Sequence, residues 1–288
     1  MSKQQKGVKV RATKKIIIIL LCLTQAISSY ALALSFQVSP AKINQAYDER
    51  EFKLPEIKVK NTSDEIADVV VIMRPLEQDL LGSAIEGSED YAYSIDKYIR
   101  IDEKDKHTTL APGEEHHFTP TVKLPKNYNA AGGYAMIYVE TIPHREGVKK
   151  SSTGVLSTGA IGILVLLEFP DNEKTYGFDL MDVNLHKKNE EALEFTATIK
   201  NEGNILNEFG GSVEITDKQG NHIASLALKP RRILPDNKVN IYTVWTPATL
   251  PQGEIQVTYE TGSPETGSKK HSQAFMITSS GQIMKLSE

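Results

Sequence analysis

The sequence is poor in cysteine and tryptophan, which excludes several kinds of site. Among 288 residues there is one cysteine, Cys22, and one tryptophan, Trp245. Cys22 falls in an N-terminal segment with the character of a leader. The mature chain would therefore hold no disulfide, no thiolate nucleophile and no cysteine-ligated zinc or iron–sulfur site. With 7% aromatic residues, the chain also lacks the set of exposed rings that would indicate a carbohydrate-binding module.

A long apolar run is missing too. The N-terminal run, residues 16–23, falls short of the about 20 apolar residues that cross a membrane. Residues 1–33 hold six basic and no acidic side chains, and Ala31 and Ala33 form a small-x-small cleavage signal. The sequence therefore predicts a signal peptide over residues 1–33 and export to the periplasm or cell surface of a bacterium. A leader kept as an anchor is the alternative; after cleavage we expect no stable membrane span.

Basic residues are in the minority once the leader is set aside. The remaining 255 residues carry 27 Lys and Arg against 37 Asp and Glu, a formal charge of −10. Binding to nucleic acid depends on neutralising phosphates, so this charge disfavours nucleic acid as a partner. It disfavours anionic membrane surfaces for the same reason.

Catalytic motifs are absent as well. His116 and His117 are neighbours on an expected strand, where successive side chains point to opposite faces, so the two do not readily share a metal ion. We find no nucleophile elbow and no glycine-rich phosphate loop that opens a helix. The sequence predicts a protein that is not an enzyme, with no catalytic residues, no metal site and no cofactor.

The sequence does contain an internal repeat. A strand-like run that ends at Asn61 has a counterpart that ends at Asn201, and each is followed by a turn containing Pro112 or Pro235. Two copies of one strand order predict an all-β fold of two tandem immunoglobulin-like β-sandwich domains. The expected division is a signal peptide at 1–33, a first domain at 34–170, a linker at 171–174, a second domain at 175–279 and a tail at 280–288.

The two copies differ most at residues 77–96. From the asparagine to the proline turn, the first copy takes 51 positions and the second takes 34. The difference indicates a long polar loop in the first copy, which is either functional or disordered. Tyr91 and Tyr93 at its exit favour a contact role, because tyrosines commonly anchor interfaces.

Residues 160–169 form the most apolar stretch after the leader. Ten residues are too few to span a membrane, and the β-branched content predicts a strand. Two interpretations stay open: a strand buried on both faces, or an apolar edge strand that pairs with another protein. The candidate binding residues on this strand alternate on one face: Ile161, Ile163, Val165 and Leu167.

Four motifs follow one another in the first domain: the strand opening at 39–43, the asparagine turn at 58–64, the Pro-Gly turn at 110–114, and the glycine pair at 132–133 before Tyr134. In that order they resemble the PapD-like immunoglobulin-fold superfamily, best over residues 34–170. This superfamily includes periplasmic pilus chaperones and the extracellular parts of WxL-interacting surface proteins.

The resemblance implies a way of binding. In pilus chaperones an apolar edge strand completes the sheet of a pilus subunit, and two basic residues in the interdomain cleft hold the subunit's terminal carboxylate. Lys42 stands at the first basic position. The second position, a few residues before Pro170, is apolar in this sequence.

We therefore predict an exported adaptor or chaperone-like assembly factor that binds another extracytoplasmic protein, such as a pilus, wall or surface subunit. Addition of a β-strand is the candidate mode of binding. The alternative is a cell-surface structural or adhesion protein whose immunoglobulin-like domains are spacers and whose 77–96 loop touches a ligand.

Overall fold

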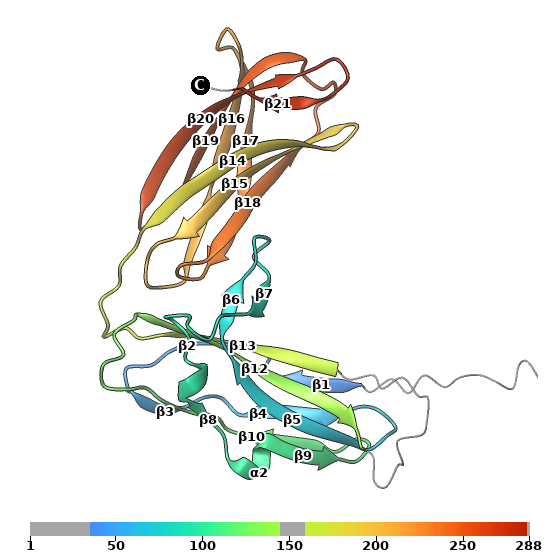
Figure 1. The fold of residues 1–288 in the computed structure, drawn as a ribbon, viewed down its shortest axis with the longest axis vertical. Coiled ribbons are helices and arrows are strands. Elements are labelled where there is room, and N and C mark those ends of the chain that lie inside the picture. The colour runs from blue at the N-terminus through green and yellow to red at the C-terminus, as the bar shows by residue number, and fades with distance from the viewer. Residues whose placement is uncertain (1–34, 145–158, 287–288) are drawn as a thin grey trace, which may run out of the picture.

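The strands of the chain form two domains (Figure 1), and each domain has its own hydrophobic core. A computed structural model describes residues 35–144 and 159–286, so the predicted leader lies outside the described residues. One core draws its side chains from Ile43 to Phe169 and the other from Phe178 to Ile277. The predicted all-β fold of two immunoglobulin-like sandwiches is confirmed. Among the described residues, we find no helix with the length and hydropathy of a transmembrane span.

The first domain encloses its core between a five-stranded sheet and two smaller sheets. Successive side chains of a strand point to opposite faces of the sheet, so every second residue can face the core. In β5, for example, Val69 and Val71 are buried, whereas Val70 and Ile72 are only partly buried. The five-stranded sheet has the order β2 (Lys42–Ala46), β13 (Gly159–Glu168), β12 (Gly132–Pro143), β5 (Ala67–Arg74), β9 (His107–Leu110). One smaller sheet has the order β1 (Phe36–Ser39), β4 (Ile57–Asn61), β10 (Glu115–Phe118). The other has the order β3 (Glu51–Lys53), β11 (Thr121–Lys123), β8 (Ile99–Arg100). Two short helical turns, η1 (Asp96–Tyr98) and α2 (Glu103–Lys106), complete the domain.

The second domain is a simpler sandwich of two sheets. Its central strand β19 buries Ile255, Val257 and Tyr259 and exposes the residues between them more. One sheet has the order β14 (Phe178–Asn189), β15 (Ala192–Asn201), β18 (Lys238–Trp245). The other has the order β17 (His222–Ile233), β16 (Asn207–Asp217), β19 (Gly253–Ser263), β20 (Gly267–Ile277), β21 (Ile283–Lys285).

The internal repeat is built around a buried asparagine in each domain. The Asn61 amide donates to the carbonyl oxygen four residues later, at 2.7 Å, and to the last carbonyl of β9, at 3.0 Å. The Asn201 amide makes the matching bonds to Ile205, at 2.9 Å, and to Ile233, at 2.8 Å. Both asparagines are almost fully buried, at 0% and 1% exposure. The repeated sequence thus reflects a repeated corner, in which one side chain ties a turn to a distant strand.

The first strand-like run after the predicted leader divides at Pro40. The sequence predicts an edge strand or a bulge there, because proline has no N–H to donate to a sheet. In the structure, β1 pairs antiparallel with β4 in one sheet, and β2 pairs parallel with β13 in another. The chain therefore changes sheets around Pro40, where the Ser39–Pro40 peptide bond is cis.

The sequence predicts a long polar loop at residues 77–96, whereas the structure has a hairpin there. Strands β6 (Leu76–Gln78) and β7 (Ala84–Glu86) pair across a tight turn. The Asp79 carboxylate accepts N–H donors from Leu81 and Ser83 at 2.9 and 2.8 Å, and Gly82 takes a φ of 76°. The hairpin rises from the first domain toward the second (Figure 1).

Candidate functional site: a free strand edge

Strand β13 has a partner on both sides over only half of its length. Strand β12 pairs with it from Gly159 to Glu168. On the opposite side, β2 pairs with it only from Leu164 to Glu168. In the described ranges, residues 159–163 thus lack a strand on that outer side.

The main-chain groups on this edge can be assigned from the hydrogen bonds to its neighbours. The Leu164 N–H donates to the Ala41 carbonyl of the segment leading into β2, at 3.2 Å, and the Glu168 carbonyl accepts from Tyr47 at 3.0 Å. Even-numbered residues of β13 therefore direct their N–H and C=O groups toward β2. Because this direction alternates along a strand, Ala160 and Gly162 direct theirs to the same side, where β2 no longer runs. These four main-chain groups have no strand partner among the described residues and can pair with an added strand.

The side chains predicted to bind lie mainly inside the first domain. Ile163 and Val165 are 0% exposed, and Leu167 is 2% exposed. Ile161, nearer the free end, is partly buried. The stripe is therefore one wall of this domain's own core, and what the strand presents outward is its main chain.

Lys42 lies at the end of the free stretch. It is the first residue of β2, faces Leu164 in register, and is exposed. Its ammonium group forms no ion pair with any described residue. A segment that runs along residues 159–163 toward β2 would end beside this cation. In pilus chaperones the second basic residue lies a few residues before the linker. In this chain that stretch is apolar, and its Leu164 and Leu166 belong to a cluster shared with the second domain.

Tyr91 and Tyr93 lie at the boundary between the domains. The Tyr91 hydroxyl donates to the Pro235 carbonyl of the second domain at 2.8 Å. The two rings pack at a centroid distance of 5.6 Å, and both belong to the shared apolar cluster. Burial raises the pKa of both phenols above the ordinary range. The contacts of Tyr91 that the structure describes are therefore within the chain.

The neighbouring histidines contact different groups, as their alternation predicts. His116 Nε2 lies 3.2 Å from an Asp105 carboxylate oxygen, whereas His117 Nδ1 lies 2.9 Å from Glu56 Oε1. No group of three potential metal ligands occurs among the described residues.

An exposed ion cluster on β4 and β10 gives a pH prediction. Hydrogen bonds from Lys58 and Lys60, each at 2.9 Å, lower the pKa of Glu115 from 4.5 to about 2. A depressed folded-state pKa stabilises the fold above the unfolded value, and this contribution is lost as pH falls from about 4.5 toward 2. We expect a carbon-13 NMR titration of the Glu115 carboxyl to show a midpoint near 2. Replacing both lysines by alanine should return it toward 4.5; a parent midpoint already at 4.5 would contradict the ion cluster.

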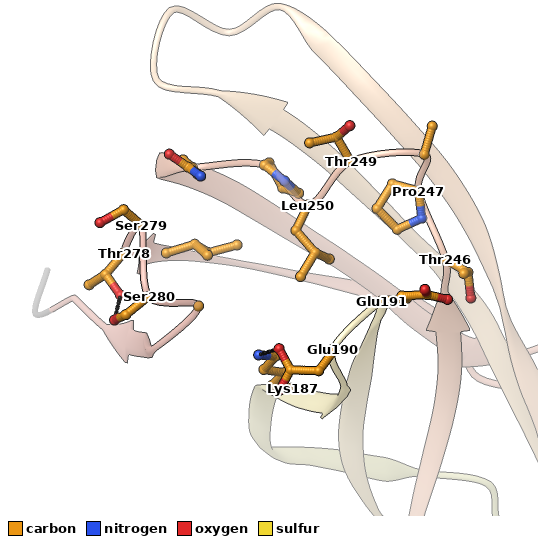
Figure 2. A pocket seen from close by; sticks show the side chains of 15 residues that line it. Lys187, Glu190, Glu191, Thr246, Pro247, Thr249, Leu250, Thr278, Ser279 and Ser280 are labelled. Atoms are coloured by element: carbon orange, nitrogen blue, oxygen red, sulfur yellow. Dashed lines mark hydrogen bonds and ion pairs between the residues drawn. The ribbon is translucent and has the colours of Figure 1, made fainter.

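The second domain has an open cavity of about 710 Å³ (Figure 2). Three loops line it, and Leu250 projects into it. Its cation, Lys187, is paired with Glu190 at 2.6 Å, and Thr278 and Ser280 bond each other at 2.8 Å. The lining holds no histidine.

No protein-family model and no curated protein matches the chain. Among solved structures, the chain is similar to bacterial pilus chaperones. The CupB2 chaperone of Pseudomonas aeruginosa is 12% identical, with 82% of this chain and 98% of that chain covered and a TM-score of 0.38. The Escherichia coli chaperone DraB is 14% identical, with 83% and 97% covered and a TM-score of 0.37.

A structure of the Salmonella enterica SafA pilin with the SafB chaperone is 8% identical, with 85% and 97% covered and a TM-score of 0.38. Each of these three solved structures contains a chaperone. Because the TM-scores lie below 0.5, these similarities carry no argument about what the chain does. The free edge of β13 is the feature of this molecule that indicates a function.

Proposed function

We propose that this protein is an exported binding factor that takes up a segment of another extracytoplasmic protein as an added β-strand along residues 159–163. The observation that carries the proposal is the outward N–H and C=O groups of Ala160 and Gly162, which have no strand partner in the described ranges. Export follows from the predicted leader, and the acidic mature chain favours a protein partner over nucleic acid.

The geometry limits the segment that fits. Five strand residues span about 16 Å. At one end, the added strand meets Lys42, where β2 takes over the same edge. A free carboxylate at that end would meet an exposed ammonium group, which favours a segment that terminates there. Main-chain bonds supply much of the affinity in this mode, whereas the side chains of the added strand supply specificity.

The test uses a defined probe, a seven-residue peptide of alternating valine and threonine with a free C-terminal carboxylate. Ala160→Pro removes one outward N–H without touching the bonds to β12, so we expect it to weaken binding about tenfold, the equivalent of one hydrogen bond. Lys42→Ala should weaken the binding of the free-acid peptide and leave the binding of a C-terminally amidated peptide unchanged. Isothermal titration calorimetry measures both effects.

The matched control is Gln256→Ala, on the second domain, which should bind like the parent. If the parent binds neither peptide, or if Ala160→Pro binds as well as the parent, the free edge is not the binding site. Far-ultraviolet circular dichroism verifies that each variant is folded.

A further inference from the structure

Two side-chain amides join the domains by reciprocal hydrogen bonds. Gln78, on β6 of the first domain, donates its backbone N–H to Asn237 Oδ1 of the second at 2.5 Å. In return, Gln78 Oε1 accepts the Leu234 N–H at 2.8 Å, and Gln78 Nε2 donates to the Arg232 carbonyl at 3.0 Å. Each domain thus supplies both hydrogen-bond donors and acceptors at the boundary between the domains. We call this pair of amides the clasp.

Asn237 is buried, at 5% exposure. Its amide nitrogen also donates to the Pro235 carbonyl at 2.9 Å, so both ends of the amide have partners. A buried polar group that loses its partner costs far more than an exposed one, because no water replaces the bond. The clasp therefore favours one relative position of the domains over others that would break it.

The tip of the same hairpin reaches the edge strand of the second domain. The Asn240 N–H of β18 donates to the Leu80 carbonyl at 2.8 Å. At the turn, a side chain added to Gly82 would come within 3.2 Å of Val239, and its φ of 76° already favours glycine. Leu80 remains 52% exposed, so this contact is made through the main chain rather than through burial of its side chain.

An apolar cluster lies at the same boundary. Leu76 and Tyr134 of the first domain pack in it with Leu234 of the second, at 1%, 1% and 3% exposure. The Tyr134 hydroxyl accepts the Leu206 N–H at 2.6 Å. The boundary thus combines buried apolar contact with directional hydrogen bonds. Interdomain interfaces without such features ordinarily permit relative motion.

We propose that the β6–β7 hairpin is a strut and that the clasp of Gln78 and Asn237 locks the angle between the two domains. The strut is part of the extra length that distinguishes the first copy of the repeat from the second. A fixed angle keeps the second domain at a set position relative to β13, whose Leu164 and Leu166 lie in the shared cluster. Such preorganisation reduces the ordering cost of binding any partner that contacts both domains.

The experiment is a distance measurement between spin labels by double electron–electron resonance on the full chain. Cys22→Ser removes the natural cysteine, and labels are attached at Asp64→Cys and Ser279→Cys, which are exposed positions on different domains. We expect a single narrow distance distribution in this parent. Gln78→Ala combined with Asn237→Ala should broaden it at least about twofold, as expected for domains free to move.

Gln256→Ala, which removes an amide away from the boundary, is the control and should leave the distribution unchanged. Tyr91→Phe removes the hydroxyl that donates to the Pro235 carbonyl at 2.8 Å and accepts from the Asn237 amide at 3.4 Å, and it leaves the bonds of Gln78 in place. It should broaden the distribution by a smaller amount, and it covers the case in which the double variant does not fold. A broad parent distribution, or a folded double variant as narrow as the parent, would overturn the proposal. Neither result depends on whether β13 binds a strand.

Discussion

Ile163→Lys is expected to unfold the first domain. Ile163 is 0% exposed, and its side chain belongs to the wall that β13 presents to the core. The substitution loses about 2–3 kcal/mol of apolar burial and places an ammonium group among the apolar side chains of the core, which costs several kcal/mol more. The total is comparable to the whole stability of a domain, about 5–15 kcal/mol.

Ala160→Lys is the control, three residues earlier on the same strand. Ala160 is exposed, and lysine is a residue that natural edge strands tolerate. Chemical denaturation followed by near-ultraviolet circular dichroism should show the first domain unfolded in Ile163→Lys and folded in Ala160→Lys. A folded Ile163→Lys protein would mean that this side chain faces solvent, as in the exposed-stripe interpretation of the sequence.

Asn201→Ala should lower the free energy of unfolding of the second domain by about 3 kcal/mol. The substitution leaves the carbonyl oxygens of Ile205 and Ile233 without their donor and the Gly203 N–H without its acceptor, which lies at 2.9 Å. Each buried group left unpaired costs about 1–3 kcal/mol. Urea denaturation measures the change as a lower transition midpoint.

Because the corner is repeated, Asn61→Ala should cost the first domain a similar amount. Asn221→Ala, an exposed turn asparagine in the second domain, is the control and should shift stability by less than about 0.5 kcal/mol. Equal midpoints for Asn201→Ala and Asn221→Ala would show that the asparagine corner is not what the repeat preserves.

The fold could be predicted because its signals are local. Alternation along strands and the repeated asparagine turn depend on residues close in sequence, and the two-sandwich architecture follows from them. The hairpin at 76–86 was not predicted, because its strands are three residues long and polar in part. Its turn signal, Asp79 followed by Gly82, is present in the sequence but is too common to identify a hairpin alone.

The site could be predicted only in part. The alternating stripe from Ile161 to Leu167 correctly marks a strand, but alternation does not distinguish a core wall from an exposed edge. That distinction depends on where β2 lies, and β2 is more than 100 residues earlier in the chain. The side chains of Ala160 and Gly162 do not indicate a binding site, because these residues face the free edge with their main-chain N–H and C=O groups. Gln78 and Asn237 likewise could not be predicted as partners, because they lie far apart in the sequence and only the folded arrangement of the two domains brings them into contact.

Hydrogen–deuterium exchange of single amides in β13, followed by NMR, tests the central claim most directly. The structure predicts slow exchange for Ile161 and Ile163, whose N–H groups face β12, and fast exchange for Ala160 and Gly162. Adding the valine–threonine peptide should slow the exchange of the Ala160 and Gly162 amides, and the exchange of the Ile161 and Ile163 amides should stay slow. Equal, strong protection of all four amides in the protein alone would mean that this edge is already covered, and strand addition there would be excluded.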